Sequence, residues 1–168
     1  MADKSTFTPD EWKSILGTTM LAGMAVTVAD QSGLWGMMKE GIASTGALLE
    51  SRKDPNANNL IKSVVADFET SEGRTAAREE IKTVLSGAAS KADIQSRAIN
   101  ALAQTAKLLD TKAPDDASAF KTWLLGIGER TANAANEGGF LGFGGVAVSD
   151  AEKAALDQIA KALNPSVA

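Results

Sequence analysis

The sequence TPDEWKSILGTTMLAGMAVTVA, residues 8–29, joins a strong helix-start signal to a long apolar segment. Thr8 and Glu11 stand three residues apart with Pro9 between them, which is the spacing of a capping box with proline at the first helical position. Apolar residues then fall on nearly every side of a helix drawn through the segment. A helix that is apolar all round is normally enclosed by other helices. We therefore predict a helix from Thr8 to about Ala29 at the centre of the fold.

Small residues and the absence of charge refine this prediction. Thr19, Gly23 and Thr27 recur every four residues, so they form a seam that allows a neighbouring helix to approach closely. The uncharged stretch from Ser14 to Ala29 is shorter than the ~20 apolar residues that a bilayer span requires. A buried core helix is therefore expected here, and no transmembrane segment.

Apolar positions at helical spacing continue along the rest of the chain, and capping signals divide them into further helices. Ser90 can cap one helix, Gly87 can end the one before it in a left-handed conformation, and Ser149 with Glu152 forms a second capping box. No convincing strand pattern is present. The additional helices are expected at about residues 34–49, 57–68, 73–86, 90–109, 114–135 and 149–163.

These patterns predict one all-α domain, a single compact bundle of about seven helices over residues 8–164. Residues 1–7 are expected to be a flexible N-terminus, and residues 165–168 a C-terminal tail. The chain has 168 residues and is 44% hydrophobic, which is enough to bury a core without a metal or a disulfide.

Charge and composition exclude several functional classes. The net charge is −4 and no run of Lys or Arg occurs, which argues against nucleic acid and leaves membrane contact at most peripheral. The first ten residues lack the basic start and apolar region of a secretory signal, so a cytoplasmic location is expected.

The chain contains no histidine, no cysteine and no tyrosine. A di-iron bundle of the ferritin type, a histidine-bearing zinc site and a serine–histidine triad are therefore impossible. Paired carboxylates occur at Glu79–Glu80 and Asp115–Asp116, but adjacent residues of a helix do not face each other. We expect the protein not to be an enzyme.

Two loops resemble ligand-binding motifs without completing them. Residues 138–145, GGFLGFGG, are followed by no Gly-Lys-Ser/Thr and preceded by no strand, so we expect a lid that buries its own aromatic rings on the bundle. Residues 54–58 place oxygen side chains like the start of an EF-hand loop, but Val65 stands where the bidentate glutamate belongs. A turn that caps the helix beginning near Ala57 is the better interpretation.

The two halves of the chain also echo each other. Asp30 and Glu137 each follow a helix and precede a glycine and a bulky apolar residue, and Trp12 and Trp123 each lie early in the preceding helix. Two related helix–loop–helix halves are therefore possible.

Residues 100–164 resemble the C-terminal half of tellurite-resistance TerB-like proteins. The resemblance is carried by Asn136-Glu-Gly138 and by SDAEKAALDQIAKAL at residues 149–163. TerB-like domains are all-helical with two related halves, each with an Asp-Gly loop before a capped helix. The resemblance implies a divalent-cation site, for Ca²⁺ or Mg²⁺, and a role in stress response or metal-linked signalling near membrane partners.

Carried over by position, the implied cation ligands are Asp30 and Glu137, with Asp150 and Glu152 as neighbours. The chain departs from the TerB-like pattern, because Gln-Ser separates Asp30 from Gly33 and a glutamate occupies the second aspartate position. The glycine-rich stretch also resembles one in uncharacterised small helical proteins of bacteria.

Three interpretations follow. The chain is a non-enzymatic binding or stress-response module with a cation site, or a homo-oligomeric structural or protein-interaction domain without a ligand. For the second, self-association is expected to cover the surface around Trp35, Met37 and Met38. The third, an enzyme, would require a deep polar pocket with a strongly shifted carboxylate or lysine. The alternative to a cation site is that the acidic residues serve only to end and cap helices.

Overall fold

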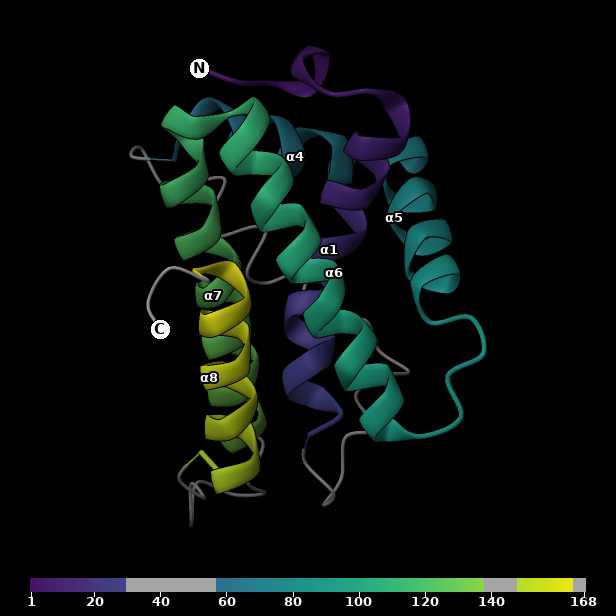
Figure 1. Cartoon of the computed structure of the whole chain (residues 1–168), viewed down its shortest axis with the longest axis vertical. Coiled ribbons are helices and arrows are strands. Elements are labelled where there is room, and N and C mark those ends of the chain that lie inside the picture. The colour runs from purple at the N-terminus through teal and green to yellow at the C-terminus, as the bar shows by residue number, and fades with distance from the viewer. Residues whose placement is uncertain (30–56, 138–147, 165–168) are drawn as a thin grey trace.

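The computed structural model describes residues 1–29, 57–137 and 148–164, with the backbone alone for residues 134–137. Six α-helices and one short 3₁₀ helix make up this part of the chain, and it contains no strand (Figure 1). The prediction of an all-α protein is confirmed. The predicted helix at residues 34–49 lies outside the described residues, so the count of seven is not tested. The observed elements are η1 (Lys4–Thr6), α1 (Pro9–Thr27), α4 (Asn59–Glu69), α5 (Ser71–Val84), α6 (Lys91–Lys112), α7 (Pro114–Glu137) and α8 (Asp150–Leu163).

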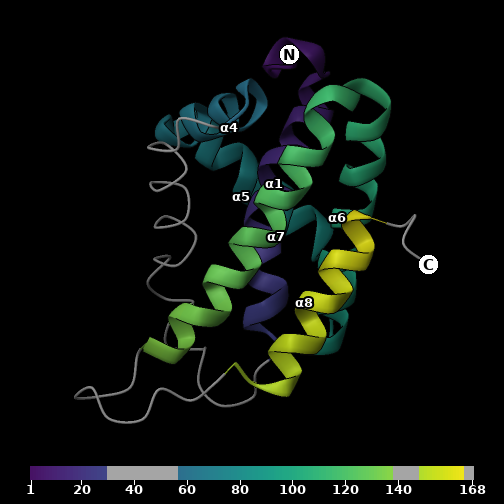
Figure 2. The same cartoon turned by 90° about the vertical axis from the view of Figure 1, so that its left-hand side faces the viewer.

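Helix α1 is the centre of the described fold. It contacts α4, α5, α6, α7 and α8, and Figure 1 shows it between α5 and α7, with α6 crossing it, while Figure 2 shows α6 beside α8. Ile15 and Leu21, which point to different sides of α1, are both 0% exposed. The expectation of an enclosed helix is therefore confirmed. Within the described ranges, no helix is both long and apolar enough to cross a membrane.

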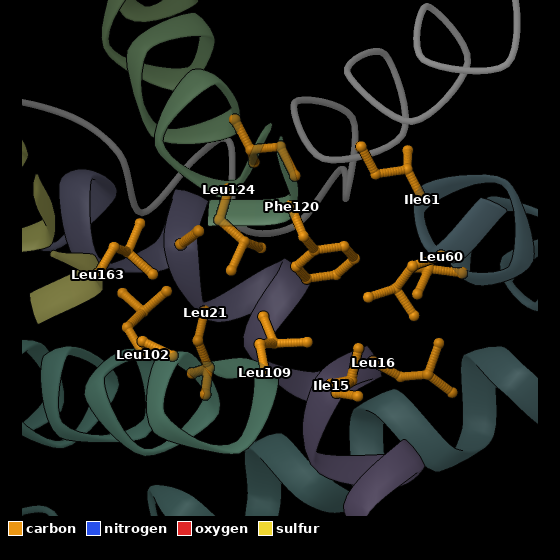
Figure 3. Packing of buried hydrophobic residues seen from close by; sticks show 14 of the residues in the cluster. Ile15, Leu16, Leu21, Leu60, Ile61, Leu102, Leu109, Phe120, Leu124 and Leu163 are labelled. Atoms are coloured by element: carbon orange, nitrogen blue, oxygen red, sulfur yellow. The ribbon is translucent and has the colours of Figure 1, made fainter. Parts of the chain in front are cut away.

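The core is a single cluster built by side chains from five helices. Figure 3 shows side chains of α1, α4, α6, α7 and α8 directed into one shared interior. The largest of them are fully buried: Phe120, Ile15, Leu16, Leu21, Leu60, Leu102, Leu109, Leu124, Ile127, Ile159, Leu163 and Val26.

The predicted small-residue seam brings α7 close to α1. A Cβ atom added at Gly23 would lie 2.9 Å from Thr131 Oγ1, so only glycine leaves room for this crossing. The Thr131 hydroxyl in turn donates to the Ile127 carbonyl at 2.9 Å, which satisfies it inside the contact.

The predicted capping signals coincide with observed helix ends. Thr8 and Glu11 form a reciprocal capping box at α1, and Ser90 caps α6. A capping turn is expected before a helix beginning near Ala57, and the observed cap is Asn58, with α4 beginning at Asn59. Gly87 has a φ of 76°, as expected for a left-handed residue after a helix, although α5 ends at Val84, slightly before the predicted end.

The N-terminal segment differs from the expected flexible end. Ala2 and Phe7 are buried at 6% and 7% exposure, and the rings of Phe7 and Trp12 lie 6.0 Å apart. The Ala2 backbone N–H donates to Asp116 Oδ2 at 2.5 Å, and the Lys4 ammonium contacts the Asp67 carboxylate at 2.9 Å. The segment is attached at Ala2, Lys4 and Phe7, because a bulky ring and two long-range polar contacts join these residues to α1, α4 and α7, while its other residues are exposed.

Candidate functional site

Of the four predicted cation ligands, the structure describes the side chains of only Asp150 and Glu152. Asp30 lies outside the described residues, and Glu137 is the last residue of α7 with no side chain described. Whether the two acidic loops meet is therefore not tested. The predicted oligomer surface at Trp35, Met37 and Met38 and the predicted lid at residues 138–145 also lie outside the described residues.

Glu152 and Asp150, the other two candidate ligands, act at the start of α8. Glu152 is 3% exposed, and its Oε2 accepts hydrogen bonds from the Ser149 backbone N–H at 2.8 Å and from the Ser149 hydroxyl at 3.0 Å. Asp150 is exposed and pairs with Lys153 at 3.3 Å. Across the described ranges, no group of three acidic side chains is placed to hold a metal ion. In this part of the chain, Glu152 belongs to the capping box of α8, and Asp150 forms an exposed ion pair beside it.

This capping role predicts different outcomes for two substitutions. Ser149→Ala is expected to lower the free energy of unfolding by about 1 kcal/mol, because α8 loses its N-cap acceptor. Glu152→Gln is expected to change it by less than ~0.5 kcal/mol, since glutamine also serves at this position of a capping box. Urea unfolding of the chelator-treated protein, followed by circular dichroism, measures both. A loss in Glu152→Gln that appears only with added calcium would instead support the cation site.

A groove between α1, α5 and α6 opens on the surface of the described structure. It offers about 240 Å³ of space and combines three carboxylates with hydroxyl and apolar side chains. Its lining residues are Asp10, Glu11, Ser14, Thr18, Glu80, Val84, Ala101, Gln104, Thr105 and Leu108.

The groove exists because α5 packs tightly on α1 and only lightly on α6. A Cβ atom at Gly17 would lie 2.5 Å from Glu80 Cγ, so glycine lets the stem of Glu80 lie directly across α1. The Ser14 hydroxyl donates to Glu80 Oε1 at 2.9 Å, and Lys13 pairs with Glu79 at 3.1 Å beside it. Glu79 and Glu80, adjacent in sequence, therefore both attach α5 to α1.

Two buried threonines form the floor. Thr18 and Thr105 are 1% and 3% exposed, and their hydroxyl oxygens lie 2.8 Å apart. The Thr18 hydroxyl donates to the Ser14 carbonyl at 2.7 Å. Since a hydroxyl has a single proton, Thr105 is the donor in the contact with Thr18.

Glu11 lies at one end of the groove with a lowered pKa. The main cause is the hydrogen bond from the Lys112 ammonium, 2.7 Å from Oε2, and the second is the Thr8 backbone N–H at 2.8 Å. Both donors favour the charged form of the carboxyl group. Glu11 therefore keeps a negative charge at neutral pH.

Removal of the Lys112 charge should raise the pKa of Glu11 towards its ordinary value. In Lys112→Met, an NMR titration of the Glu11 carboxyl carbon is expected to show this increase, while the unchanged Thr8 contact preserves part of the shift. A lowered pKa stabilises the fold above the unfolded value and is lost as the pH falls through the folded value. The stability difference between Lys112→Met and the parent should therefore be present at pH 7 and vanish well below pH 4.5. An unchanged Glu11 pKa would contradict the contact.

Sequence reasoning missed this groove. Its polar residues come from three helices, and Ser14 and Glu80 stand 66 positions apart in the chain. Within the sequence, the Glu79–Glu80 pair is the only feature that draws attention to this region. It is set aside because adjacent residues of a helix do not face each other. No protein-family model matches the chain, and neither a curated protein nor a solved structure matches it.

Proposed function

We propose that this chain is a non-enzymatic helical binding domain whose contact site for a protein partner is the groove between α1, α5 and α6. The observation that carries the proposal is the lining of that groove, in which carboxylates stand above a buried hydroxyl floor and beside apolar walls. Its volume of about 240 Å³ is below the ~300–1,000 Å³ typical of small-molecule pockets. The groove therefore suits one side chain of a partner better than an enclosed substrate.

The available residue types support a binding function over catalysis. The full sequence has no histidine, cysteine or tyrosine, so a proton-transfer site would depend on carboxylates and lysines alone. Glu11 at the groove has a lowered pKa, which makes it a weaker base than an ordinary glutamate.

The test compares two double variants of equal charge in partner capture from cells. Asp10→Asn with Glu80→Gln changes the groove, whereas Glu129→Gln with Asp157→Asn removes two exposed carboxylates from α7 and α8. A partner retained by the parent and the control but lost from the groove variant supports the proposal. Equal retention by all three proteins, or no partner retained by the parent, contradicts it. Matching unfolding midpoints confirm that the variants are folded.

A second candidate function rests on the TerB-like resemblance of residues 149–163, which implies a cation-responsive stress module. A ligand that binds only the folded state raises stability by about 2.7 kcal/mol at a hundredfold excess over its Kd. Thermal unfolding of chelator-treated protein with millimolar calcium or magnesium measures this rise. An increase that Asp30→Asn with Glu137→Gln abolishes would support the candidate, and no increase with either ion would contradict it.

A further inference from the structure

We propose that the group received by the groove is the ammonium of a lysine side chain carried by the protein partner. This inference rests on the proposed function and specifies its ligand chemistry. It follows from the direction of the hydrogen bonds in the groove, from its charge and from its apolar walls.

The hydroxyl protons of the groove are all used inside the protein. Thr18 donates to the Ser14 carbonyl, Thr105 donates to Thr18, and Ser14 donates to Glu80 Oε1. Each hydroxyl oxygen keeps acceptor lone pairs after donating its proton. Thr105, although 3% exposed, thus offers an acceptor at the floor of the groove.

The carboxylates add further acceptors without a compensating cation. Among the described residues, neither Asp10 nor Glu80 Oε2 has an ion-pair or hydrogen-bond partner. No basic side chain lines the groove, and Lys112 at its edge is already bonded to Glu11 at 2.7 Å. A ligand with hydrogen-bond acceptors would be repelled by these oxygens. A cation that only donates hydrogen bonds complements them.

A lysine side chain meets these requirements. Its ammonium has three donors and no acceptor, and its four-carbon stem can lie along apolar surface while the charge reaches polar groups. Val84, Ala101 and Leu108 provide that apolar surface, and all three are half-buried beside the carboxylates. Arginine also complements a free carboxylate through its planar fork, so an arginine peptide serves below as the control that separates the two side chains.

Neither a metal ion nor a free amine fits the groove as well. Calcium takes six to eight oxygen ligands, and the described residues contain no cluster of three acidic groups able to hold a metal. A small amine would leave much of its surface in water, because Asp10 and Gln104 at the rim are exposed. A partner protein can cover the rim while it delivers one lysine.

The experiment is an NMR titration of the full ¹⁵N-labelled chain with short capped peptides. The probe is acetyl-Ala-Ala-Lys-Ala-Ala-amide, and the matched controls replace lysine with norleucine or arginine. The lysine peptide is expected to shift the amide signals of Ser14, Thr18, Glu80 and Thr105, with at least threefold higher affinity than the norleucine peptide. The groove variant Asp10→Asn with Glu80→Gln should lose at least threefold in affinity, whereas Glu129→Gln with Asp157→Asn should not.

Several results would overturn the inference. They are equal binding of the lysine and norleucine peptides, tighter binding of the arginine peptide, shifts outside the groove, and an unaffected groove variant. Tighter binding of 1,4-diaminobutane than of the lysine peptide would assign the groove to a free amine and also contradict a partner lysine. If partner capture depends on the groove while the lysine peptide fails to bind, the proposed function stands and only the lysine assignment falls.

Discussion

Replacing Leu21 with alanine is expected to lower the free energy of unfolding by about 3 kcal/mol. Leu21 is 0% exposed in the middle of α1 and lies in the shared core shown in Figure 3. Buried Leu→Ala substitutions cost about 2–5 kcal/mol, because the lost apolar contact is joined by the cost of the cavity left behind. Urea unfolding followed by circular dichroism measures the change.

Met24 provides the matched control for Leu21. It lies one helical turn further along α1, but it is only half-buried against the core. Met24→Ala should therefore cost clearly less, about 1 kcal/mol. Equal losses at the two positions, or a loss below about 1 kcal/mol at Leu21, would show that α1 is not enclosed on that side.

Replacing Gly73 with alanine is expected to cost about 2 kcal/mol, although alanine normally favours a helix. A Cβ atom at Gly73 would lie 2.6 Å from the Asp67 carbonyl carbon and closer still to its oxygen, so the backbone of α4 would have to move. Overpacking of this kind typically costs 1–3 kcal/mol. Thermal or urea unfolding detects a loss of this size.

The reason for the tight approach lies at the junction of α4 and α5. Thr70 ends one helix and caps the next, since its hydroxyl donates to the Asp67 carbonyl at 2.7 Å and accepts from the Gly73 N–H at 2.9 Å. Asp67 also accepts from the Trp12 indole at 2.6 Å and from Lys4 at 2.9 Å. Displacing Asp67 is therefore expected to weaken the attachment of the N-terminal segment as well.

Gly126, within α7, is the control for Gly73. No atom lies within 4 Å of a Cβ added there, so Gly126→Ala should raise stability by up to about 1 kcal/mol through the higher helix propensity of alanine. The same substitution thus has opposite expected signs at the two positions. A gain in stability at Gly73 would contradict the close contact between α4 and α5.

Local sequence predicted most of the helix boundaries, because capping depends on neighbours in the chain. The boxes at Thr8 and Ser149 and the caps at Asn58 and Ser90 all use partners three residues away. The same locality limits the cation prediction. Within the described residues, the oxygens of Glu152 bind the Ser149 cap, and a capping acid and a metal-ligating acid have the same short-range sequence pattern.

The amino-acid sequence by itself predicts the all-helical class and the central position of α1. Both follow from the apolar pattern of single helices, which is either amphipathic or apolar all round. Packing alone sets the groove. Thr18 meets Thr105 across 87 positions, and Ala2 meets the buried Asp116 across 114. Such contacts depend on helix crossing angles and on where glycines such as Gly17 and Gly23 permit close approach. These long-range contacts form only in the folded chain, where residues of α1, α5 and α6 come together to line one groove.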